Sequence, residues 1–112
     1  MNRPVIARNI VERGARPEQA REHYEHSLQY AEQTGDHFSA GHARRNMALM
    51  HAQASHREDQ PSRQRDLLLR ARAYAEAALR DFQHYQGRAA SDEADAQRVL
   101  DQIGKDLAKL PQ

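Results

Sequence analysis

The chain has 112 residues, and its 17 Lys and Arg residues nearly balance its 16 Asp and Glu residues. This balance argues against a dedicated nucleic-acid binder, which normally carries a larger or more segregated basic excess. Cysteine is absent and no apolar run approaches the roughly 20 residues that span a bilayer, so disulfides, thiolate chemistry and a membrane-spanning helix are not expected.

The first predicted helix covers residues 4–13 and carries one apolar stripe, formed by Val5, Ile6, Ile10 and Val11. A second helix is predicted over residues 17–34. Pro17 suits a first helical turn, and Gly35 is a stop signal. The expected inner face of this second helix consists of Ala20, Tyr24, Ser27, Leu28 and Ala31.

The third predicted helix begins after Asp36, which can act as its N-cap, and runs to about Ala54. Gly41 within it indicates a close crossing with another helix. A polar stretch over residues 55–62 is the expected loop that follows. The buried stripe of this helix is expected to contain Phe38, Ala43, Met47, Met50 and Ala54.

The fourth predicted helix is the longest, opening at Pro61 and running to about Gln86. The fifth begins after Ser91 or Asp92, either of which can cap it. The expected inner face of the fourth helix contains Leu68, Ala71, Ala75, Ala78, Phe82 and Tyr85. That of the fifth contains Ala96, Val99, Leu100, Ile103, Leu107 and Leu110.

The residue types favour a single all-α domain over residues 1–112. Only six residues are Val or Ile, whereas Ala, Gln, Arg and Glu are abundant, which disfavours strands. The mean hydropathy of −1.03 predicts a thin, alanine-rich core. A cytoplasmic location is expected, because the N-terminus lacks the apolar stretch of a secretory signal, although a mature form whose signal had been removed would look the same.

A spaced motif occurs in both the second and the fourth predicted helix. Residues 20–28 place Ala, Tyr, Ser and Leu at offsets 0, 4, 7 and 8, and residues 71–79 place Ala, Ala, Ala and Leu at the same offsets. These offsets stack on one face of a helix. Small side chains there let a second helix approach closely, which is typical of a solenoid of helix pairs.

The motif resembles that of the tetratricopeptide repeat family, in which a helix A alternates with a helix B. A first repeat is matched by Ile6, Ala7, Ile10, Gly14, Ala20, Tyr24, Ser27 and Leu28. A second is matched by Met47, Ala48, Ser55, Ala71, Ala75, Ala78 and Leu79, and a third helix A starts at Val99 and Leu100. The resemblance implies a short α-solenoid of antiparallel helix pairs, with about five helices or two and a half repeats.

The spacing departs from the family period. Ala20 and Ala71 are 51 positions apart, against a period of about 34. His51 also stands where the family prefers tyrosine. Residues 28–36 and 46–48 are similar to the long repeats of kinesin light chains and of bacterial signalling regulators.

The resemblance implies a protein–protein interaction module, such as an adaptor, because the A helices of this family line a concave groove that receives a peptide. The groove-facing side chains would be Arg8, Arg45, Asn46, Leu49, Gln53, Arg98 and Gln102. The Asn46 amide offers a donor and an acceptor to a ligand backbone, and the arginines would favour an acidic segment. Alternatively, Asn46 makes an interhelical hydrogen bond and the arginines are merely solvated.

Structural self-assembly is the second functional hypothesis. Without a partner helix, the fifth predicted helix would expose an apolar stripe, and fewer than about three repeats are marginal in isolation. A homodimer through this stripe is therefore the alternative, with Ile103→Asp expected to break it while sparing the helices. The interface residues would be Val99, Leu100, Ile103 and Leu107.

No catalytic, metal or cofactor motif is recognisable in the sequence. A Gly-rich phosphate loop, a nucleophile elbow and His-Glu-x-x-His are all missing. His23 and His26 share one helix face, but no Glu-x-x-His pattern accompanies them. We therefore expect a non-enzymatic protein without cofactor or metal, which binds a protein or peptide partner and neither nucleic acid nor membrane.

Overall fold

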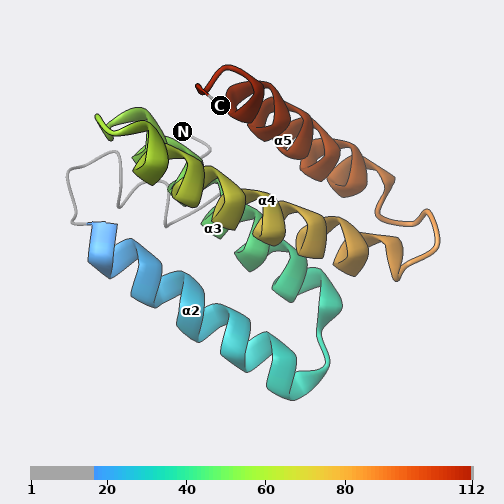
Figure 1. Cartoon of the computed structure of the whole chain (residues 1–112). Helices are drawn as coiled ribbons and strands as arrows, with labels where there is room; N and C mark the ends of the chain where they lie inside the picture. Colours follow the sequence, from blue (N-terminus) through green and yellow to red (C-terminus); the bar gives the residue numbers. More distant parts are fainter. Residues whose placement is uncertain (1–16, 112) are drawn as a thin grey trace, which may run out of the picture.

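The computed structural model describes residues 17–111, which form four helices joined by short connections (Figure 1). They are α2 (Pro17–Thr34), α3 (His37–His56), α4 (Pro61–Gln83) and α5 (Ala90–Ala108). No strand occurs among these residues, so the all-α fold class is confirmed for them. The helix predicted over residues 4–13, and Arg8 with it, lies outside the described residues.

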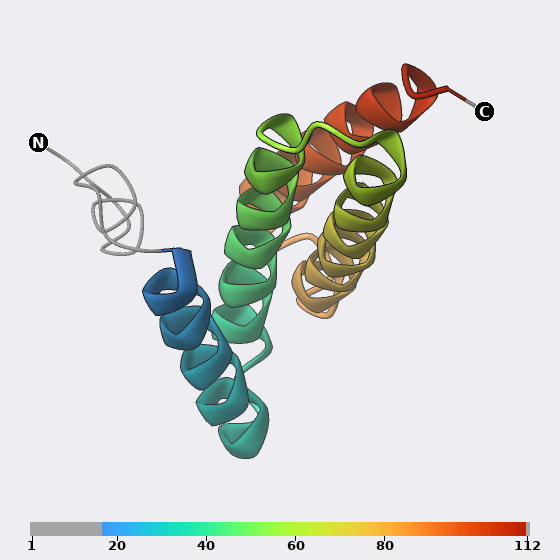
Figure 2. The same ribbon diagram turned by 60° about the vertical axis from the view of Figure 1, so that its left-hand side comes forward.

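Helix α3 is the central element of the fold. It packs on α2 and α4, whereas α5 packs mainly on α4 and touches α3 more lightly. Figure 2 shows α2 on one side of α3 and α4 on the other, with α5 passing behind α3 and α4. Successive helices run antiparallel, so α3 and α5 run parallel, and their side chains meet in the same order along both: His42 with Asp92, Arg45 with Asp95 and His56 with Asp106.

The start and stop signals of α2 and α3 act as the sequence predicts. α2 spans Pro17–Thr34. Gly35 then takes a positive φ of 70°, a backbone conformation that glycine adopts without a steric penalty. The backbone N–H of Ser39 donates to Asp36 Oδ1 at 3.0 Å, so Asp36 is the N-cap of α3. This bond lowers the pKa of Asp36, because it favours the ionised carboxylate.

Three other predicted boundaries are wrong by a few residues. α4 ends at Gln83 and not at Gln86. α3 continues to His56, so the connection to α4 is shorter than the polar stretch over residues 55–62. Ser55 is buried in this last turn, where its hydroxyl donates to the Ala52 carbonyl at 2.6 Å. α5 starts after Ala89, which makes no side-chain capping bond, and not after Ser91 or Asp92.

The core is alanine-rich, as the composition predicts. The three alanines of the second copy of the spaced motif, Ala71, Ala75 and Ala78, are inaccessible to solvent on α4, and its Leu79 is half-buried. The first copy is buried only in part. Ser27 is exposed, contrary to the prediction, and its hydroxyl donates to the His23 carbonyl one turn earlier on the same helix.

The apolar stripe of α5 is largely covered by α4 and α3, so the expectation that it is exposed is wrong for Ile103. Ile103 is 1% exposed and lies in a core cluster with Ala48 and Leu68. The stripe faces inward because α5 lies against both α4 and α3. Ile103→Asp would therefore bury a charge and is expected to unfold the protein. The other three stripe residues are half-buried against the same cluster, namely Val99, Leu100 and Leu107.

Gly41 marks a close helix crossing, as the sequence predicts. A Cβ atom at this position would lie 2.7 Å from Cε1 of Phe82 on α4, and Phe82 is itself fully buried. Such a distance is too short for two carbon atoms in contact. The absence of a side chain at Gly41 therefore lets α3 and α4 approach each other at this point.

We predict that Gly41→Ala lowers the free energy of unfolding by about 1–3 kcal/mol, because it overpacks a filled site. Gly104→Ala on α5 is the matched control, since a Cβ there would meet nothing within 4 Å. The control is expected to raise stability by about 0.5–1 kcal/mol through helix propensity. Urea unfolding of both variants measures the difference, and equal effects would contradict the assigned crossing.

A buried carboxylate, Asp81, was not anticipated from the sequence. It is 6% exposed on α4, and its Oδ2 accepts from Arg44 Nη1 of α3 at 2.6 Å. The other arm of Arg44 donates to Glu32 Oε2 on α2 at 2.5 Å. His37 Nδ1 lies 3.4 Å from Asp81 Oδ1. Arg44 thus connects three helices. Because Asp81 is buried, loss of its partner would destabilise the fold more than loss of a surface ion pair would.

Arg44→Ala is expected to cost about 2–3 kcal/mol of unfolding free energy, because among residues 17–111 it leaves the buried Asp81 with His37 as its remaining partner. Arg80→Ala, at an exposed position of α4, is the control and should change stability by less than about 0.5 kcal/mol. Chemical denaturation of both proteins tests this. If the two substitutions cost the same, Arg44 does not stabilise the fold through Asp81.

Candidate functional site

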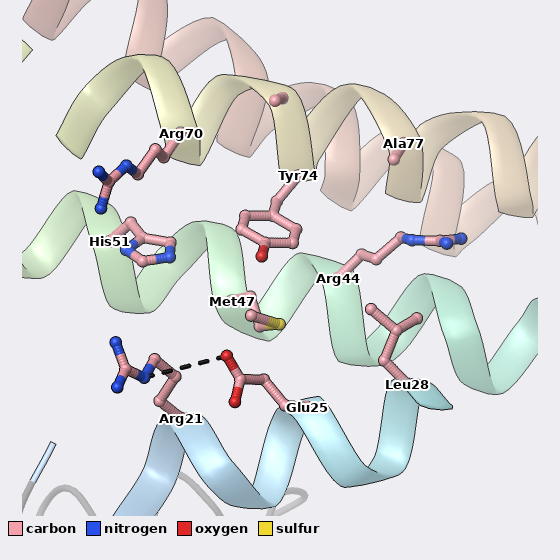
Figure 3. A pocket seen from close by; sticks show the side chains of 10 residues that line it. Arg21, Glu25, Leu28, Arg44, Met47, His51, Arg70, Tyr74 and Ala77 are labelled. Carbon is pink, nitrogen blue, oxygen red and sulfur yellow. Dashed lines mark ion pairs between the residues drawn. The ribbon is translucent and has the colours of Figure 1, made fainter. Parts of the chain in front are cut away.

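An open groove of about 580 Å³ lies over α3, with α2 forming one wall and α4 the other. Figure 3 shows that side chains from all three helices point into it. Ten residues line the groove: Arg21, Glu25 and Leu28 of α2; Arg44, Met47 and His51 of α3; and Arg70, Ala73, Tyr74 and Ala77 of α4.

The floor and the walls of the groove are apolar in the middle. Met47 is buried between α2 and α3, in one cluster with Ala20 and Tyr24. The Tyr74 ring packs against this cluster from α4 and stacks on the His51 ring, with 5.5 Å between the centroids and 13° between the planes. Met47 itself is 1% exposed and forms the floor. The accessible apolar surface is that of Leu28, Ala73, Tyr74 and Ala77, and it provides area for burying an apolar side chain of a ligand.

One end of the groove is cationic. Figure 3 shows the Arg21 and Arg70 side chains extending toward His51 from opposite walls. Glu25 is the carboxylate at this end, and its Oε2 lies 3.9 Å from Arg21 Nε. Burial lowers the pKa of His51, and the positive charges of Arg70 and Arg21 lower it further, against the opposing effect of Glu25. His51 is thus neutral near pH 7 in a positive field.

At the other end of the groove, the cationic side chain is already paired within the protein. Arg44 reaches this end from α3 on the side of Leu28, but both of its arms are held by Asp81 and Glu32. Figure 3 shows Arg44 at the opposite end of the groove from His51. The guanidinium of Arg44 is therefore a fixed part of the wall, whereas those of Arg21 and Arg70 are exposed at the rim.

The groove-facing residues predicted from the resemblance lie instead along α3 and α5. Arg45 pairs with Asp95 of α5, and its Nη1 donates to Asn46 Oδ1 at 3.2 Å. Asn46 thus bonds to its neighbour within α3, and not between helices as the alternative interpretation held. The remaining described members are Leu49, which is half-buried, and three exposed residues, Gln53, Arg98 and Gln102.

Two exposed members of this set on α5 are bonded along their own helix. Arg98 Nη2 donates to Asp95 Oδ1 at 3.3 Å, and Gln102 Nε2 donates to Asp106 Oδ1 at 3.0 Å. Such exposed pairs contribute little stability and exchange readily with other partners. The structure does not bring this set into the groove described above.

Sequence reasoning missed the groove, although its pattern is present in the chain. Residues 21, 25 and 28, then 44, 47 and 51, then 70, 74 and 77 repeat a spacing of three to four residues on three helices. This spacing defines a second face on each helix, beside the alanine-rich face. An arginine begins each of the three sets, which is the signal that could have identified the groove.

Comparisons with known proteins identify no relative, because no family model, curated protein or solved structure matches the chain. Among residues 17–111, no helix is both long enough and apolar enough to cross a membrane. The histidine and acidic side chains of that region do not gather in groups of three or more that could hold a metal ion. His23 and His26 are both exposed on α2.

We predict that His51→Gln makes the protein relatively more stable in acid. Below pH 6.5, the ordinary pKa of histidine, the unfolded chain takes up a proton at His51 that the folded protein resists. Wild-type stability from this group is therefore complete above pH 6.5 and declines as the pH falls toward the lowered folded pKa. Urea unfolding at pH 7.5 and 5.5 measures this effect. Between these two pH values, the free energy of unfolding of the wild type should fall more than that of the variant.

His26→Gln, at an exposed position of α2, is the control for this experiment. Comparison with it separates the effect of His51 from the loss of any histidine. If the stability difference between His51→Gln and the wild type does not change with pH, the groove does not resist protonation of His51.

Proposed function

We propose that this protein is a protein–protein interaction module that holds a segment of a partner protein in the groove over α3. The observation that carries this proposal is the shape and chemistry of the groove. It is open, its middle is apolar, and its rim carries charged side chains from α2 and α4. This combination is typical of sites that bind a side chain by burial and orient it by polar contacts.

The packing of the helices supports the proposal in a second way. Consecutive helices are antiparallel, α3 and α5 run parallel, and α4 contacts both, which is the alternation that a tetratricopeptide-like array of helix pairs would give. We therefore propose a short helical array of this type. Arrays of this kind present extended surfaces between neighbouring helices to their ligands.

The α3–α5 surface predicted from the resemblance remains a competing location for the same function. Arg45 and Asn46 on this surface already bond to Asp95 and to each other, so a ligand would have to displace these contacts. In the groove, by contrast, Tyr74 and Ala73 are accessible without any such rearrangement. The groove is therefore the favoured location.

A random nine-residue peptide library displayed on phage tests the function with the full chain. We predict that selected peptides lose at least about tenfold in affinity for Ala73→Trp, because an indole at this exposed position fills the groove. Ala94→Trp, at an exposed position of α5, is the control and should bind as the wild type does. Fluorescence anisotropy of labelled peptides gives the affinities.

The same peptides distinguish the two surfaces. Asn46→Ala should leave binding unchanged if the groove over α3 is the site. If Asn46→Ala weakens binding while Ala73→Trp does not, the site is the α3–α5 surface. If selection yields no peptide that responds to either substitution, the proposed function is wrong.

A further inference from the structure

We propose further that the groove selects an acidic segment, with one ligand carboxylate bound between Arg21 and Arg70 and a neighbouring large apolar side chain lying over Met47 and Tyr74. This inference rests on the proposed function and specifies the chemistry of its partner. It concerns a surface formed by α2, α3 and α4, and not the α3–α5 surface to which the resemblance points.

Within the part of the chain that the structure describes, the positive charge at the His51 end of the groove is not balanced by carboxylates. Arg21 and Arg70 face a single carboxylate, Glu25. Among residues 17–111, no carboxylate forms an ion pair with Arg70. The contact of Arg21 with Glu25 is long, and both side chains are more than half exposed, at 54% and 52%, so a ligand can displace it at little cost.

Guanidinium groups suit a carboxylate because their N–H donors are planar and can form two parallel hydrogen bonds. Figure 3 shows Arg21 and Arg70 on opposite walls, so they can donate to one carboxylate from two sides. The neutral His51 between them offers a further donor or acceptor. Charge complementarity therefore identifies an anionic group as the ligand at this end.

The rest of the groove fixes the direction of the bound segment. Arg44 at the far end is already neutralised by Asp81 and Glu32, so it does not attract a second anion strongly. Between the two ends lie Met47, Tyr74 and Ala77, which match an aliphatic or aromatic side chain. We infer a segment with its acidic residue toward His51 and its apolar residue toward Leu28.

Binding of the carboxylate should be coupled to protonation of His51. The groups that face His51 are Arg21 and Glu25 of α2, and Arg70 and Tyr74 of α4. A ligand carboxylate adds a negative charge beside this ring, which favours the imidazolium form. The protein then takes up a proton on binding, so affinity should rise as the pH is lowered from 7.5 to 6.0.

The experiment uses the phage-selected peptides together with matched synthetic pairs in which each Glu is replaced by Gln. We expect the selected peptides to be enriched in Asp and Glu beside a large apolar residue. Each Gln peptide is expected to bind at least about tenfold more weakly than its Glu counterpart. Arg70→Gln and Arg21→Gln should each weaken the Glu peptide and leave the Gln peptide nearly unchanged. Arg72→Gln, an exposed residue of α4 outside the groove, is the control.

The outcomes separate this inference from the proposed function. Neutral peptides that bind wild type, lose affinity for Ala73→Trp and ignore Arg70→Gln would overturn the acidic segment while keeping the interaction module. Preferential binding of inorganic phosphate or of a single-stranded RNA 12-mer, sensitive to Arg21 and Arg70, would also overturn it. A pH-independent affinity for the Glu peptide, unchanged in His51→Gln, would remove the coupling to His51.

Discussion

The contact between α3 and α4 at Gly41 and Phe82 is the constraint on which the rest of the structure depends. Because Gly41 has no side chain, the Phe82 ring lies directly against the backbone of α3. Arg44 lies one turn further along α3. The close approach of the helices lets its Nη1 donate to Asp81 Oδ2 of α4 at 2.6 Å. An apolar contact and a partly buried ion pair thus fix the same crossing, one through packing and the other through charge.

Arg44 connects this crossing to the groove. It lies where α2, α3 and α4 come together, and it bonds to Asp81 of α4 and to Glu32 of α2. Among the described helices α2 packs on α3, and the contact of Arg44 with Glu32 adds an ion pair to this packing. The width of the groove between α2 and α4 is therefore set by the core at one end. At the other end, Arg21 and Arg70 extend from exposed positions.

The sequence predicted the helices well, because their signals are local. Pro17, Gly35 and Asp36 determine helix ends within one or two turns of themselves. The spacing of the alanines in α4 likewise predicts which face of that helix is buried. The tertiary arrangement was less predictable. Ile103 appeared exposed because nothing in the sequence indicates that α5 folds back on α3 and α4. Asp81 likewise reads as a solvated charge until Arg44, 37 positions earlier, lies beside it.

The site shows the same division between local and non-local information. Each helix that forms the groove has two faces of similar spacing. The small alanine side chains of one face give a clear packing signal, whereas the arginines of the other face resemble ordinary solvated residues. The predicted site used the face of α3 that contains Arg45 and Asn46, where Asp95 of α5 now neutralises the arginine. The opposite face contains Met47 and His51, and α2 and α4 leave it open between them. A charged side chain is available to a ligand only where no helix of the same chain supplies its counter-charge, and this depends on which helices become neighbours.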